Sequence, residues 1–151
     1  MACHRRVEER LEMMGRAAAH LGDQREAALE AFAAAFRFMD TSGTLHTADE
    51  EESLFRRLMP LLEGGERDYL SGLEHDHTVA HGLYADLKAA VAQFADEPQA
   101  QARLSGLVER LARIYRRHIA SENETLQAIA RQRLSRAQIA EVAGEMKRRR
   151  A

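Results

Sequence analysis

Three pairs of potential metal-ligating residues lie four positions apart in this chain, and they constrain its fold more than any other feature. The pairs are His46–Glu50, His77–His81 and His118–Glu122. On an α-helix, residues four apart differ by about 40° of rotation and about 6 Å of rise, so both members of a pair project from one face. The spacing therefore predicts helices that each present two polar side chains together.

The rest of the sequence is typical of an all-α protein, because Ala, Leu, Glu and Arg dominate and only two residues are proline. Apolar residues recur at helical spacing in four long segments and a short fifth. The expected helices are 4–21, 23–63 with a kink or short break near Gly43, 66–94, 98–129 and 135–150. We therefore expect an up-down four-helix bundle with a short C-terminal fifth helix, forming one domain over residues 1–151.

Charge and cysteine content exclude several classes of protein. Lys and Arg number 22 and Asp and Glu number 24, so a nucleic-acid binder with a basic excess is not expected. The single cysteine, Cys3, rules out an internal disulfide framework and a multi-cysteine metal site. No apolar run approaches the roughly 20 residues of a membrane span, and the first residues lack a signal-peptide core. We expect a cytoplasmic protein that binds neither nucleic acid nor membrane, and the sequence leaves its oligomeric state open.

The paired residues occupy helix faces that should point into the core. His77 and His81 interrupt the apolar stripe of the third helix, and His118 and Glu122 interrupt that of the fourth, while His4 begins the stripe of the first. A buried carboxylate without a partner costs many kcal/mol, so partners are expected. The candidate metal ligands are His4, His46, Glu50, His77, His81, His118 and Glu122.

A metal centre would satisfy all seven side chains at once. Nitrogen and oxygen donors without thiolate suit iron, and zinc, manganese and copper are compatible with the same donors. Seven ligands exceed the needs of one tetrahedral ion, so two metals bridged by the carboxylates are expected. A polar core network without metal is the alternative. His20 and His75 lie about 160° around their helices from His4 and His77, so we expect both at the surface.

The chain also carries an internal repeat. HTADEEESL at 46–54 and HIASENETL at 118–126 share a His, a Glu four residues later and a Leu eight residues later. The repeat predicts a bundle with approximate two-fold symmetry about its middle. Glu8, four residues after His4, is the expected outer partner of that histidine.

These segments, with HRRVEERLEMM, LEHDHTVAHGL and EMKRR, resemble the hemerythrin-like, or HHE cation-binding, family. The resemblance implies four helices around a non-haem di-iron centre, with an oxo or hydroxo bridge between the two Fe ions. Carried over, one iron would take His4 and His46, the other His77, His81 and His118, and Glu50 and Glu122 would bridge them. The oxygen carriers have an Asp five residues after the fourth-helix His, whereas Glu122 lies four after His118. In some relatives His81 has no counterpart.

The resemblance implies a protein that binds a small diatomic ligand, O2 or NO, for sensing, storage or delivery. We expect no output domain in this chain, so a sensor would need a partner protein. Two alternatives stay open: a di-iron oxidoreductase acting on peroxide or NO, and a non-catalytic iron-binding or iron-sensing module whose folding depends on metal. The sequence does not decide between enzyme and binding protein.

Overall fold

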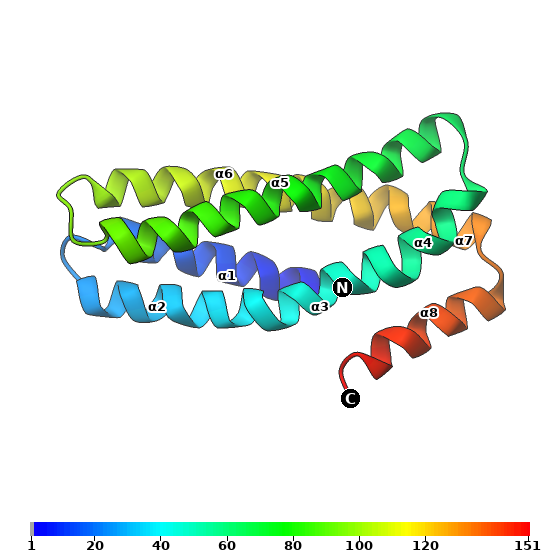
Figure 1. Ribbon diagram of the computed structural model, residues 1–151, viewed down its shortest axis with the longest axis horizontal. Coiled ribbons are helices and arrows are strands. Elements are labelled where there is room, and N and C mark those ends of the chain that lie inside the picture. Colours follow the sequence, from blue (N-terminus) through cyan, green and yellow to red (C-terminus); the bar gives the residue numbers. More distant parts are fainter. Residues whose placement is uncertain (1) are drawn as a thin grey trace.

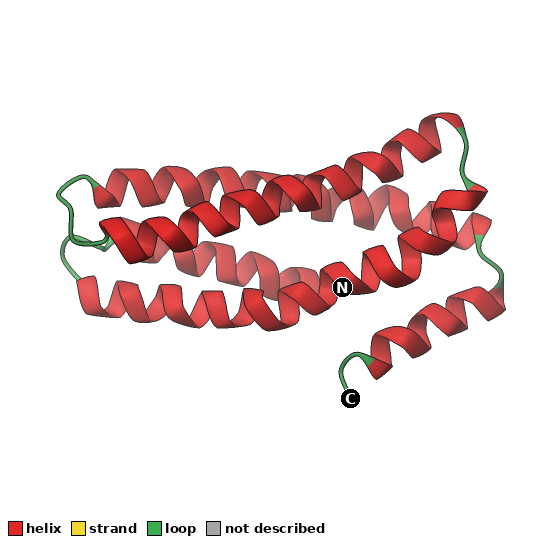
Figure 2. Ribbon diagram, in the orientation of Figure 1, coloured by secondary structure: helices red, strands yellow, loops and turns green. Residues whose placement is uncertain are grey.

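The computed structural model describes residues 2–151, and those residues form helices and no strand (Figure 1, Figure 2). Four long helical segments run up and down beside one another, and a fifth helix follows them. The first segment packs against the second and the fourth, and the third packs against the fourth. The expected all-α bundle with a short C-terminal helix is confirmed.

The helix bounds follow the expected segments closely. The first and third segments are α1 (Ala2–Ala19) and α5 (Gly64–Phe94). The second is continuous and comprises α2 (Arg25–Phe38), η1 (Met39–Gly43), α3 (Thr44–Ala48), η2 (Asp49–Phe55), α4 (Arg56–Leu58) and η3 (Met59–Leu61). The fourth comprises α6 (Ala100–Ser121), η4 (Glu122–Leu126) and α7 (Gln127–Arg133), and the fifth is α8 (Arg136–Arg148).

We expected a kink or short break near Gly43, and the second segment continues there through the π-helical stretch η1. In a π turn each backbone hydrogen bond reaches one residue further, so an extra residue fits without ending the helix. The hydroxyl of Thr41 donates to the carbonyl of Arg37 at 2.7 Å, and that of Thr44 donates to Asp40 at 3.1 Å. These bonds occupy carbonyls of the widened stretch. The second segment ends at Leu61. The next helix, α5, begins at Gly64, whose φ of 51° is a conformation that glycine adopts without strain.

The core consists of two apolar clusters on either side of a polar layer. Leu11, Phe32 and Leu87 are fully buried in the larger cluster, and Phe55 and Leu70 are buried in the smaller one. His46 and Glu50 on the second segment, His77 on the third and Glu122 on the fourth lie between residues of these two clusters. The polar layer is therefore shielded from water by apolar side chains above and below it.

Charged side chains tie α8 and the residues just after it to η2 and α4. Arg57 donates to Glu145 of α8 at 2.8 and 3.0 Å. The buried carboxylate of Asp49 accepts from Arg149 at 3.0 Å and from Arg150 at 2.5 Å. The start of α8 is capped by Ser135, whose hydroxyl accepts from the backbone N–H of Gln138 in a capping box.

In the part of the chain that the structure describes, no helix is both long and apolar enough to cross a membrane.

Candidate metal centre

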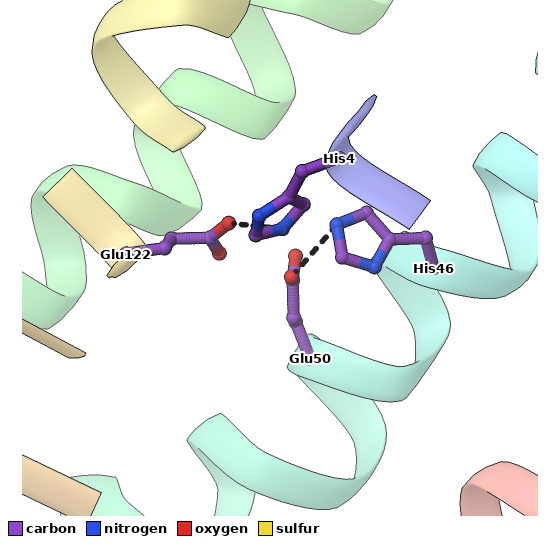
Figure 3. Close-up of side chains that lie close together, drawn as sticks. All are labelled: His4, His46, Glu50 and Glu122. Atoms are coloured by element: carbon purple, nitrogen blue, oxygen red, sulfur yellow. Dashed lines mark ion pairs between the residues drawn. The ribbon is translucent and has the colours of Figure 1, made fainter. Parts of the chain in front are cut away.

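Six of the seven predicted ligands come together in the polar layer. They form two groups that share both glutamates, and in each group one ligand atom per residue lies within 4.8 Å of the others. The first group is His4, His46, Glu50 and Glu122, and the second is Glu50, His77, His118 and Glu122. Figure 3 shows the first group, in which four side chains from three separate segments point toward one another.

Each glutamate lies between two pairs of histidines, His4 with His46 and His77 with His118, and turns one oxygen toward each pair. Glu50 places Oε1 3.0 Å from His46 Nε2 and Oε2 3.1 Å from His77 Nε2. Glu122 places Oε2 3.1 Å from His4 Nε2 and Oε1 3.2 Å from His118 Nε2. Both carboxylates therefore have the arrangement of a bridge between two cations. The arrangement has the approximate two-fold symmetry that the sequence repeat predicts.

Several of these atoms approach one another without forming hydrogen bonds. Within residues 2–151, His4 Nε2, Glu50 Oε2 and both oxygens of Glu122 are buried and have no hydrogen-bond partner, although they lie at ion-pair distance. The Nε2 atoms of His77 and His118 face each other at 3.0 Å in a hydrogen bond, in which one ring donates and the other accepts. For the unpartnered atoms the distances are short but the directions are wrong for hydrogen bonds, because the atoms converge on shared space rather than on each other. This convergence of nitrogen and oxygen donors fits a cation in each group.

The outward nitrogens of two histidines donate to acceptors of their own, and that of a third lies near a carboxylate. His77 Nδ1 donates to Glu51 at 2.8 Å, and His4 Nδ1 donates to the side-chain oxygen of Asn123 at 3.2 Å. His118 Nδ1 lies 3.6 Å from Asp76, which is an ion-pair distance rather than a hydrogen bond. An acceptor at Nδ1 keeps the proton there and leaves the lone pair of Nε2 free to face the centre.

The side chains that lie behind the histidine Nδ1 atoms were not predicted correctly from the sequence. For His4 we expected Glu8, but the structure supplies Asn123 from the fourth segment. Glu51 and Asp76 are sequence neighbours of predicted ligands, yet the histidines they serve lie 26 and 42 residues away. No local pattern signals such a pairing, because it depends on how the helices are rotated against one another.

The charged groups of the layer stabilise one another before any cation binds. Burial alone would lower the pKa of His46, but the neighbouring Cys3 and Glu50 side chains outweigh burial and raise the pKa to about 11. Burial alone would raise the pKa of Glu122, yet the neighbouring imidazoles of His118 and His4 hold this pKa well below its usual value. A cation must therefore displace protons from the imidazoles in order to bind.

His81 is the predicted ligand that the structure leaves outside both groups among the residues described. Its side chain is exposed, because it lies one turn beyond His77 on α5, past the level of the bridging carboxylates. It lines a polar hollow together with His77, Tyr84 and Tyr115. His20 and His75 are exposed, as expected.

The sequence matches the family described as Hemerythrin HHE cation binding domain over residues 1–130. The matched range holds every residue of both ligand groups and ends before α8. No curated protein and no solved structure matches the chain.

Proposed function

The chain belongs to the hemerythrin HHE cation-binding family and is a metal-binding domain, and from this premise we propose that it is a non-haem di-iron protein. Its function in this proposal is to bind a small diatomic ligand, O2 or NO, for sensing, storage or delivery. One observation carries the proposal: Glu50 and Glu122 each turn one oxygen to either histidine pair. Two carboxylates shared in this way suit two cations better than one.

The donor set supports iron among the metals that accept nitrogen and oxygen ligands, since each group offers two imidazoles and two carboxylates and no thiolate. When bound, two irons would supply electrons and a free coordination position for a diatomic ligand. The chain's own residues hold and orient that centre. Glu51 and Asn123 fix the ring planes of His77 and His4 through their Nδ1 atoms, and the apolar clusters exclude water from the layer.

The two halves of the centre differ in their outer charge. Glu51 and Asp76 place two carboxylates behind His77 and His118, whereas the partner of His4 is the neutral amide of Asn123. A carboxylate behind an imidazole makes that ligand more basic and favours the more highly charged state of its metal. In our proposal the diatomic ligand therefore binds at the half held by His4 and His46.

A second candidate function is an oxidoreductase that reduces peroxide or NO, which requires a proton donor beside the centre. Tyr115 supports this candidate because it lines the same hollow as His77. Burial, followed by the charge of Glu50, raises the pKa of Tyr115 to about 12, so the phenol keeps its proton at neutral pH. Turnover of hydrogen peroxide that falls in Tyr115→Phe with metal content unchanged would favour the enzyme.

The proposal is tested on protein loaded with ferrous iron in the absence of oxygen. We expect two irons per chain, one for each ligand group, and a charge-transfer band that appears in air and disappears when O2 is removed. Reversal of the band distinguishes a binding protein from irreversible oxidation. Loading well below two irons per chain would refute the di-iron assignment, and a band that never reverses would refute reversible O2 binding.

A further inference from the structure

A hollow of about 290 Å³ lies beside the His46 half of the centre, and we call it the α8 hollow. Its polar lining includes the candidate ligands His46, Glu50 and Glu122. Its apolar lining includes Leu54, Leu126, Ala130 and, from α8, Met146. The hollow therefore lies between the ligand groups and α8, and Met146 of α8 forms part of its wall.

The α8 hollow is larger than a diatomic ligand needs. A water molecule occupies about 30 Å³ of liquid, so this volume corresponds to roughly ten heavy atoms. Pockets for organic ligands begin at about 300 Å³ and combine apolar walls with a few polar groups. The α8 hollow has that size and that composition, so it suits a small organic molecule.

Two residues of the hollow come from outside the range that matches the family. Met146 lies on α8 and Arg150 just after it, whereas the match ends at residue 130. Arg150 is held in place at the hollow by the buried carboxylate of Asp49, at 2.5 Å. Met146 and Arg150 thus line the hollow from outside the matched range, and Arg150 is anchored to η2 at Asp49, next to Glu50.

The charge of the two sides of the centre also differs. The hollow on the His77 side is lined by the carboxylates of Asp40, Glu51 and Glu52, which contact Lys88, His77 and Arg149, and among the described residues no lysine or arginine lines it. In the α8 hollow, the carboxylates are the shared ligands and Asp49, and the guanidinium of Arg150, which pairs with Asp49, lines the hollow as well. A cation in each ligand group would outweigh the two glutamates, so this side favours an anionic head group.

We propose that the α8 hollow binds a short-chain aliphatic carboxylate, with its head group toward the His46 half of the centre and its tail along Leu126, Ala130 and Met146. The inference rests on the proposed metal centre and names an organic ligand class for the same half. The tail fills the apolar wall, and the volume limits it to roughly ten heavy atoms in all. The α8 residues thereby determine which molecules reach the metal-binding half.

The test uses the full chain loaded with zinc, a diamagnetic divalent cation, and labelled with ¹³C at the methionine methyl groups. Metal content is measured first, so failure to load reports on the metal centre and not on the hollow. Acetate, butanoate and hexanoate are then titrated while the Met146 methyl signal, assigned with Met146→Leu, is followed by NMR. We expect this signal to shift and the affinity to rise up to about fourfold for each added methylene.

A matched pair of variants on α7 locates the tail. Ala130→Leu adds bulk inside the hollow, so it should abolish the increase in affinity from acetate to hexanoate and leave the affinity for acetate unchanged. Ala128→Leu makes the same change at an exposed position of the same helix and should keep the increase in affinity. Equal affinity for all three carboxylates in the native protein, or a Met146 signal that does not move, would overturn the proposal. The native series gives this answer even if Ala130→Leu fails to fold.

Discussion

Glu50→Gln is the substitution that separates a shared metal ligand from an ordinary buried ion pair. Glu50 belongs to both ligand groups, and its two oxygens lie 3.0 and 3.1 Å from the nitrogens of His46 and His77. The amide keeps the shape of the side chain and removes the charge and one oxygen donor. A single change should therefore weaken both groups, because one loses its oxygen and the other keeps only a neutral amide oxygen, whereas a histidine substitution weakens only one group.

The expected loss follows from the position of Glu50 in the centre. Removing an outer partner of a metal ligand weakens binding about 10- to 100-fold, and a direct ligand should cost at least the upper end of that range. A 100-fold loss is about 2.7 kcal/mol for each ion. The metal-dependent part of the free energy of unfolding should fall by at least about this amount per ion, because ligand binding to the folded state adds to stability.

The measurement is denaturant unfolding with saturating metal and with chelator, together with the metal content per chain. Glu124→Gln is the control, because it makes the same change at an exposed position of η4. It should retain the full metal-dependent stabilisation. If Glu50→Gln loaded two ions with the affinity of the native protein, Glu50 would not be a shared ligand and the bridging arrangement would be wrong.

Three further predictions address single groups. His118→Ala should lower metal content while His75→Ala leaves it unchanged, since only His118 faces the centre; equal losses by mass spectrometry would contradict the ligand groups. Metal uptake at neutral pH should release protons, because the pKa of His46 is raised to about 11, and an indicator that records no release would contradict this. The same shift stabilises the metal-free fold below pH 6.5 and this contribution is lost as the pH rises through 11. Arg57 lowers the pKa of Glu145 to about 2, so this contact should hold α8 above pH 4.5 and release it as the pH falls toward 2. Hydrogen exchange of α8 that is already fast at pH 6 would refute this.

Local signals in the sequence predicted the structure best. Apolar periodicity located all five helical segments. Element ends and helix distortions were predicted less well. The fourth helix was expected from residue 98 but α6 begins at Ala100, and the kink or short break expected near Gly43 is a π-helical stretch. Both depend on hydrogen bonds within a turn that residue types constrain only weakly.

The sequence by itself determined which residue types occupy the inner face of each helix. Spacing within one helix fixes the face on which a side chain lies, so spacing alone pairs His46 with Glu50 and His118 with Glu122. The exposed positions of His20 and His75 followed from the same rotation argument. These predictions succeed because a helix has a fixed local geometry.

Only the tertiary structure decided how the helices combine these side chains into a centre. It gave each carboxylate oxygen a different histidine, left His81 outside both groups within residues 2–151, and paired His4 with Asn123. It also brought α8 against η2 and so formed the wall of the α8 hollow. These features depend on the axial shift and rotation of whole helices against one another. That packing is set by the two apolar clusters together, and no single segment of the sequence encodes it.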